Sequence, residues 1–242
     1  VLFRSIVVAL TNYIAEYGQT HFDLSMKALY EMTKRFSSEG AIRHFIINHK
    51  QKTLDLFHTW VQDENVHVRR LVSESTRPRL PWAMQLPDFI KDPSPIIPLL
   101  EALKNDTKLY VRRSVANNLN DISKDNPTIT TQVLTTWNQT PSKDMTWLTK
   151  HALRTLIKQG DPTTLTLLGF NTQIQLDSHL DLDKSTLQLG EALTFEMSLT
   201  STTQNPQPLM IDFVIHHVKA NGKRTPKVFK WTQKTLHRSE EH

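Results

Sequence analysis

The sequence contains no cysteine and only six glycines among its 242 residues. Without cysteine there can be no disulfide, no thiolate metal site and no cysteine nucleophile. Glycine-rich phosphate loops, His-Glu-x-x-His metal motifs and Gly-x-Ser-x-Gly nucleophile turns are also missing from the sequence. No apolar run approaches the roughly 18 residues that a membrane-spanning helix needs. We therefore expect a protein that works without a metal ion, without an organic cofactor and outside a membrane.

Positive charge is in slight excess and is unevenly distributed. The chain has 29 lysines and arginines against 24 aspartates and glutamates, which gives a formal net charge of +5. Residues 171–242 hold eight of each sign, so the whole excess belongs to residues 1–170. A basic region indicates a polyanion such as nucleic acid as one candidate partner, although proteins without such a partner also reach this charge.

Residues 1–170 show the apolar periodicity of helices. Apolar side chains recur at steps of three and four residues, for example at Leu24, Ala28 and Met32, as one buried helix face requires. Prolines gather between such stretches, in residues 78–98 and at positions 127, 141 and 162. Because proline interrupts helices, these positions predict the connections between them.

An internal repeat organises this helical region. The stretch DENVHVRRLV at residues 63–72 matches DTKLYVRRSV at residues 106–115, 43 residues later, and a weaker copy, WLTKHAL, stands at residues 147–153. Two helices per unit at a period near 40 residues are typical of HEAT-like repeats. We predict a mainly α chain in which residues 1–170 form a HEAT-like helical-repeat solenoid with a concave surface.

Residues 171–242 change to the period of two that strands show. Apolar side chains alternate over residues 176–182 and 187–199, and residues 210–218 and 228–231 are further strand-like runs. These runs predict about five strands of a partial all-β immunoglobulin-like sandwich, since a complete one has about seven. The chain begins within an apolar helical pattern and stops without a closing element, so we expect it to be part of a longer product.

The segment VRRLVSESTRPRLPW at residues 68–82 is the most unusual part of the chain. Arg70, Glu74 and Arg77 are three and four residues apart, so they share one face of a helix. That helix must end before Pro78, and two prolines then stiffen the path to Trp82. The group could be an ordinary surface ladder of ion pairs beside a tryptophan that fills a gap between repeats. It could also be a functional site in which arginines flank a carboxylate.

Three stretches of the chain resemble the AlkC branch of the alkylpurine DNA glycosylases, a family of HEAT-like repeat proteins related to AlkD. The first is the segment at residues 68–82, and the second is YVRRSVANNLNDISKDNP at residues 110–127. The third, HHVKANG followed by PKVFK within residues 216–230, is similar to the immunoglobulin-like tail of many AlkC proteins. The stretches stand in the family's order and cover nearly the whole chain. Ser75 departs from the pattern, which has glycine there.

The resemblance implies an enzyme, a DNA glycosylase that hydrolyses the N-glycosidic bond of cationic alkylated bases such as 3-methyladenine in base excision repair. Such a base leaves as a neutral molecule, so the chief demand is to stabilise an oxocarbenium-like sugar. A carboxylate can do this and orient a water, and a tryptophan face can stabilise a cation. The implied catalytic residues are Glu39, Glu74, Asp121 and Trp82, with Asp121 nearest to the sugar and the water.

An alternative function uses the same residues without catalysis. On residue type alone, Glu39 could complement a helix N-terminus and Asp121 could be an ordinary helix-end residue. The chain would then be a HEAT-repeat scaffold that binds DNA or protein. The two hypotheses differ in geometry, because an active site requires the four side chains to converge on one cleft.

Basic side chains along the repeats could contact DNA phosphates without reading base sequence, or could hold the carboxylates. Of Arg112 and Arg113, one should tie its repeat to the next while the other is free to face a phosphate. The turn at Asn221 could add a groove contact or be only a solvated hairpin. The predicted DNA-binding residues are Arg70, Arg77, Arg79, Arg113, Lys150, Lys219 and Lys223.

Together these expectations describe two domains, a DNA partner and a place in the cell. Residues 1–170 would form the glycosylase domain, and residues 171–242 an incomplete immunoglobulin-like β domain. The partner would be double-stranded DNA with alkylated bases, which the enzyme could bend or from which it could extrude the target base. We expect a monomer that acts at the nucleoid in a bacterial cytoplasm.

Overall fold

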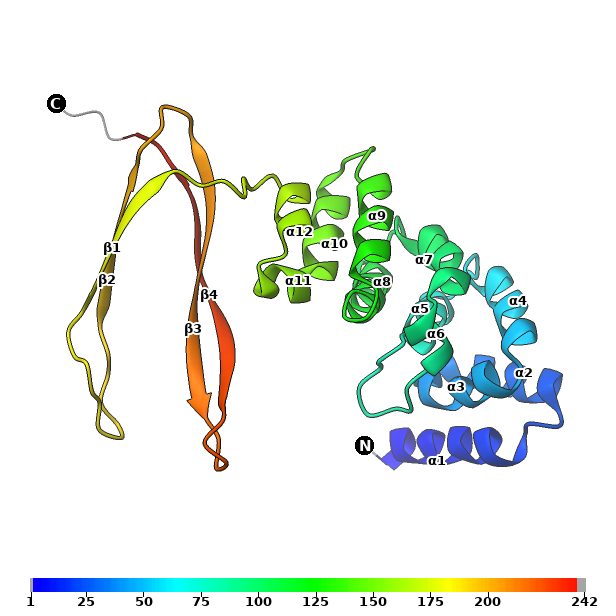
Figure 1. The fold of residues 1–242 in the computed structure, drawn as a ribbon. Helices are drawn as coiled ribbons and strands as arrows, with labels where there is room; N and C mark the ends of the chain where they lie inside the picture. The colour runs from blue at the N-terminus through cyan, green and yellow to red at the C-terminus, as the bar shows by residue number, and fades with distance from the viewer. Residues whose placement is uncertain (1, 239–242) are drawn as a thin grey trace. The chain divides into compact units, whose positions relative to one another are not determined.

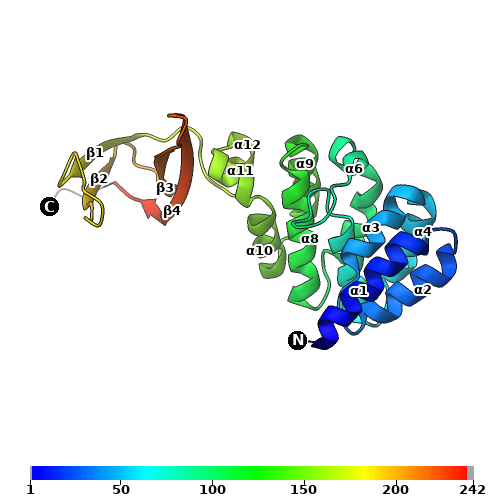
Figure 2. The same ribbon diagram turned by 90° about the horizontal axis from the view of Figure 1, so that it is seen from below.

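The computed structural model describes residues 2–238. The chain forms two compact units, Val1–Gln159 and Gly160–His242. The first is helical, and the second contains one short helix followed by strands (Figures 1 and 2). This confirms the predicted mainly α class with a C-terminal β region. None of the described helices is long and apolar enough to cross a membrane.

The first unit consists of paired helices. Short helical segments with a proline at the first or second position lie in the connections between the pairs. The helices are α1 (Leu2–Tyr17), α2 (Phe22–Thr33), α3 (Glu39–Asn48), α4 (Lys50–Trp60), α5 (Val66–Ser75), α6 (Pro87–Lys91), a 3-10 turn (Ser94–Ile96), α7 (Ile97–Leu103), α8 (Leu109–Ile122), α9 (Pro127–Trp137), α10 (Lys143–Ala152) and α11 (Arg154–Gln159).

Helices α3, α5, α8 and α10 pack in one row, each against the next, and we call them the central row (Figures 1 and 2). Helices α4, α7 and α9 each pack against a member of the row. The apolar stripes meet between these layers, where Val68 and Val72 of α5 and Val111 and Val115 of α8 are 0% exposed. Helices α5 and α8 begin 43 residues apart, at Val66 and Leu109. The helical repeat is therefore confirmed in its period and in its two helices per unit.

The first arginine of each repeated Arg–Arg pair ties one repeat to the next. Arg69 donates from Nε and Nη2 to the Asp106 carboxylate at 2.5 and 3.1 Å. At the equivalent position, Arg112 donates from Nη2 to Asp144 Oδ1 at 2.8 Å. This confirms that one member of the Arg112–Arg113 pair is structural, and the other member, Arg113, is exposed.

The second unit contains two antiparallel hairpins. After α12 (Pro162–Leu167), strand β1 (Leu176–Leu182) pairs with β2 (Phe195–Ser201), and β3 (Gln207–Val218) pairs with β4 (Arg224–Leu236). Aromatic rings join the two sheets, since Phe195 of β2 lies 5.0 Å from Trp231 of β4 and 5.9 Å from Phe213 of β3 between ring centroids. The strand-rich character of this region is as predicted.

The prediction of about five strands is wrong for the described residues, which contain four. Leu187 and Leu189 alternate as a strand would, but they lie in the connection between β1 and β2. Gly190 turns the chain there with a φ of +94°, a conformation that interrupts a strand. Strand pairing resumes only where Asp183 and Thr194 close the connection with hydrogen bonds.

Candidate active site

Charged side chains from α3, α5, α8 and the start of the loop after α5 form a continuous network along the central row. Arg70 Nη1 lies 3.2 Å from Glu39 Oε2, and Arg70 Nη2 lies 3.5 Å from Glu74 Oε1. Arg77 then bridges the next two carboxylates, with Nη1 2.7 Å from Glu74 Oε1 and Nε 2.8 Å from Asp121 Oδ2. Three of the four predicted catalytic residues therefore belong to one alternating chain of charges, which we call the carboxylate network.

The inner part of the network is almost completely removed from solvent. The Glu74 side chain is 8% exposed and that of Asp121 is 1% exposed. Ser114 donates from Oγ to Glu74 Oε2 at 2.6 Å, and Lys124 Nζ lies 2.9 Å from Asp121 Oδ1. Because buried carboxylates without partners are costly, these donors are what permits two of them to lie so close together.

Arg77 is the centre of this arrangement. Burial by itself would lower the pKa of the Arg77 guanidinium, but the hydrogen bond to Asp121 and the charge of Glu74 outweigh that effect and the pKa is raised. Arg77 therefore remains a cation at any physiological pH.

The outer end of the network is more open. Glu39 is the first residue of α3, and its side chain is 24% exposed. Arg70 is 17% exposed, donates to Ser37 Oγ at 3.1 Å, and lies with its guanidinium carbon 5.4 Å from the centre of the Tyr110 ring. A ligand would reach Glu39 and Arg70 before it reached Asp121.

Trp82 does not join the carboxylate network. Its side chain is fully exposed, and it stands in the loop of residues 76–86 between α5 and α6 with a φ of +60°. The four side chains were expected to converge on one cleft. The three carboxylates are linked to one another through arginines, and Trp82 stands outside this network. Pro78 and Pro81 stiffen the loop that carries it, and none of the described residues covers the ring.

The predicted phosphate-binding residues fall into two groups. Arg70 and Arg77 are bonded to carboxylates within the network, and Arg79 forms a two-bond pair with Asp125 at 2.6 and 2.7 Å. That hydrogen bond is also the main reason why the pKa of Arg79 is raised. The other four side chains are exposed: Arg113 on α8, Lys150 on α10, and Lys219 and Lys223 at the β3–β4 turn.

Two hydrogen-bond donors of the network, Ser114 and Lys124, were not predicted from the sequence. Ser114 occupies the repeat position at which the first copy has the buried Leu71. A serine in place of a core leucine was the available signal for a buried polar partner. Lys124 carried no signal, since a lysine near the end of a helix is most often solvated.

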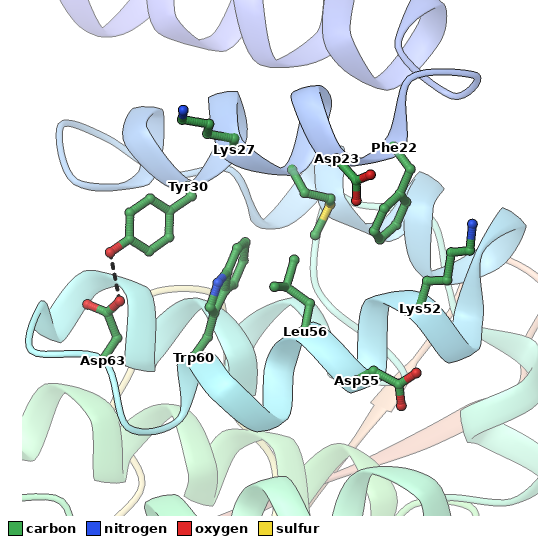
Figure 3. A pocket seen from close by; sticks show the side chains of 10 residues that line it. Phe22, Asp23, Lys27, Tyr30, Lys52, Asp55, Leu56, Trp60 and Asp63 are labelled. Atoms are coloured by element: carbon green, nitrogen blue, oxygen red, sulfur yellow. Dashed lines mark hydrogen bonds between the residues drawn. The ribbon is translucent and has the colours of Figure 1, made fainter.

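A separate groove lies between α2 and α4, away from the predicted site residues (Figure 3). It has a volume of about 750 Å³, and the side chains of Tyr30, Leu56 and Trp60 approach one another across it. Tyr30 donates from its hydroxyl to Asp63 Oδ2 at 2.7 Å. None of the residues predicted to be catalytic lines this groove. Within the described residues, no group of three or more His, Asp or Glu side chains is placed to hold a metal ion.

Comparison with known families is informative for both units. A family model described as DNA alkylation repair enzyme matches residues 14–156, which is more than half of the chain. The chain belongs to the DNA alkylation repair enzyme family. A second family model, described as the C-terminal Ig-like domain of the uncharacterised protein YhaZ, matches residues 177–242. The carboxylate network of this family member lies wholly within the first match, and Lys219 and Lys223 lie within the second.

Individual relatives of this DNA alkylation repair family member support the same assignment. The uncharacterised protein YhaZ of Bacillus subtilis (strain 168) is 40% identical over 235 residues. The structure of Pseudomonas fluorescens alkylpurine DNA glycosylase AlkC bound to DNA containing an abasic site analog is similar with a TM-score of 0.90 and 41% identity. Each alignment covers 96% of this chain and 65% of the relative. The chain therefore spans 65% of the length of these two relatives.

Proposed function

We propose that this protein is an alkylpurine DNA glycosylase that releases cationic alkylated bases such as 3-methyladenine from double-stranded DNA. The observation that carries this proposal is the carboxylate network, in which Glu39, Glu74 and Asp121 come together through two arginines. The similarity to a glycosylase that was solved with DNA containing an abasic site analog supports the same reaction class. The reaction would be the first step of base excision repair.

The chemistry needs little acid catalysis. The bond between the sugar carbon C1′ and the base nitrogen breaks, and its electron pair neutralises the positive ring, so the base leaves uncharged. The sugar acquires oxocarbenium character, which a nearby carboxylate stabilises electrostatically. A water adds its oxygen to C1′ and gives its proton to a carboxylate.

The residues divide this work according to their positions. Asp121 would face the sugar and the water, and Glu74 and Glu39 would extend the negative potential toward the outer end of the network. Arg77 and Arg70 would hold the carboxylates in place rather than contact phosphates. Trp82 would offer its ring face to the cationic base or sugar.

Basic residues of both units would bind the DNA backbone. Arg79, Arg113 and Lys150 stand on the repeats, and Lys219 and Lys223 stand on the β3–β4 turn. Backbone contacts of this kind carry no sequence information, which suits an enzyme that must find damage in any sequence. We place the enzyme in the bacterial cytoplasm as a monomer at the nucleoid, acting without a metal ion or a cofactor.

Release of the base tests the proposal directly. The full-length protein is incubated with methylated DNA under single-turnover conditions, and released 3-methyladenine is measured. Glu74→Gln and Asp121→Asn should each reduce the rate by about 10²-fold, the usual cost of losing one group that stabilises transition-state charge. Glu101→Gln is the matched control, because Glu101 is an exposed glutamate that pairs with Lys104 outside the network.

Two outcomes would count against the proposal in different ways. If both network variants release bases at the unaltered rate, the assignment of the site is wrong although the activity stands. If the unaltered protein binds methylated DNA and releases no base, the enzyme proposal is wrong and the chain is the scaffold considered as the alternative.

A further inference from the structure

The loop that carries Trp82 is held at both ends by one buried side chain. Arg43 lies on α3 and is 0% exposed. Its Nε donates to the carbonyl oxygen of Met84 at 2.7 Å, and its Nη1 donates to the carbonyls of Ser75 at 2.9 Å and Arg77 at 2.6 Å. Ser75 and Arg77 stand where the chain leaves α5, and Met84 stands where it returns toward α6. One guanidinium therefore joins the two arms of the loop of residues 76–86.

Trp82 lies between these arms with an unfavourable backbone conformation. Its φ of +60° is rare for a bulky side chain and costs on the order of 1–3 kcal/mol. Such a conformation persists only where its surroundings impose it. The exposed indole ring cannot do so, which leaves the backbone anchors. These are the turn bond from the Ala83 N–H to the Leu80 carbonyl at 3.4 Å, the bond from the Leu86 N–H to the Pro78 carbonyl at 3.0 Å, and the bonds from Arg43, which hold the two arms on either side of that turn.

Burying the charged guanidinium of Arg43 costs free energy that packing alone would not justify. Burial, together with the nearby charge of Arg77, lowers the pKa of its guanidinium to about 10, so the group is still protonated at neutral pH. Its hydrogen-bond partners among the described residues are neutral carbonyls, and its Nη2 has no partner. An apolar side chain of similar volume would avoid the cost of burying that charge. The planar set of donors is therefore the property that only arginine supplies here.

We propose that Arg43 is a positioning residue that sets the conformation of the 76–86 loop and, through it, the direction of Trp82. The consequence for base release rests on the proposed function, whereas the consequence for the loop does not. Arg43 touches no substrate in this scheme.

The first experiment measures the loop itself. Arg43→Lys keeps the charge and loses the planar fork, so the Leu86 amide should exchange with solvent roughly tenfold faster, and trypsin should cleave after Arg79 faster by a similar factor. Arg112→Lys is the matched control, since Arg112 is also buried and also donates to a carbonyl, that of Asp106. The control should leave loop exchange within about twofold of the unaltered protein.

Some results would overturn the structural part of the proposal. One is an equal loosening of the loop by both variants, and another is faster exchange throughout α5 and α8 with no excess in the loop. If Arg43→Lys does not fold, the unaltered protein still tests whether the loop is held at all. Its Leu86 amide should exchange as slowly as the amides of α5, and fast exchange there would mean that nothing holds the loop.

A double-mutant cycle measures the functional part. Arg43→Lys should slow single-turnover release of 3-methyladenine by about tenfold, and it should add nothing further in a Trp82→Ala background, because both changes act through the same ring. Additive effects would overturn the action through Trp82. If the unaltered protein releases no base, the proposed function fails, and hydrogen exchange alone still decides whether Arg43 fixes the loop.

Discussion

At the scale of single residues, the network depends most on Arg77. The Arg77 side chain donates to Glu74 and to Asp121 at once. The backbone carbonyl of Arg77 accepts a hydrogen bond from Arg43. Truncating one partner of a buried ionic group leaves the others buried without compensation, which is much more costly than losing a surface pair. The same arginine is thus the point at which the stability of the repeats and the arrangement of the site are coupled.

The first prediction compares two arginines of the same segment. Arg77→Met should lower the free energy of unfolding by about 3–5 kcal/mol, as expected for a broken buried ion pair. Arg79→Met should have a far smaller effect, because its pair with Asp125 is at the surface. Urea denaturation followed by circular dichroism measures both. Equal losses in the two variants would contradict the central position given to Arg77.

At the scale of helices and loops, the sequence predicted the elements that belong to a repeat and did not predict the course of the loop that occurs once. Copies of one motif predicted α5 and α8, and the arginine pairs predicted the tie between repeats. The loop after α5 has no second copy. Its course depends on Arg43, which lies on α3, a helix that is distant in the sequence but packs against α5. No local pattern could therefore show that Trp82 would be held fully exposed.

The prediction of about five strands failed for a related reason. Alternation at Leu187 and Leu189 is a local pattern, whereas a strand needs a partner to bond to. The turn at Gly190 separates these residues from β2, so they remain in a connection.

The tie between repeats predicts a dependence of stability on pH. Burial raises the pKa of Asp106, but hydrogen bonds from Arg69 and from the backbone of Lys108 outweigh it, so the pKa lies below the ordinary 3.8. A carboxyl whose pKa is lowered by folding stabilises the protein above its unfolded pKa, and this contribution is lost as pH falls through the folded value. Urea midpoints of the unaltered protein should therefore fall more steeply than those of Asp106→Asn as the pH is lowered below about 4. Parallel curves would show that the tie carries no such linkage.

At the scale of the whole molecule, ion pairing decides which basic side chains would be available to DNA. Many of the acidic residues are already bonded to arginines, as Asp106, Asp121 and Asp125 are. Arg113, by contrast, is exposed and forms no ion pair with any described residue. Under the proposed function, the acidic network would be the part of the DNA-binding surface where charge serves chemistry rather than affinity.

This view predicts a specific salt dependence. If Arg113 contacts one phosphate, Arg113→Gln should reduce the slope of log affinity against log salt concentration by about 0.9. Lys52→Gln is the control, since Lys52 lines the groove between α2 and α4. Fluorescence anisotropy with a methylated duplex at several salt concentrations measures both slopes. An unchanged slope for Arg113→Gln would remove this residue from the DNA interface.

The most direct test of the account separates catalysis from binding in one variant. For Asp121→Asn, single-turnover release of 3-methyladenine and affinity for DNA that contains an abasic site analog are measured on the same preparation. We predict a release rate lower by about 10²-fold, with an affinity that is unchanged or slightly greater because a negative charge has been removed. Release at the unaltered rate, or an equal loss of release and of binding, would contradict the claim that the carboxylate network performs the chemistry.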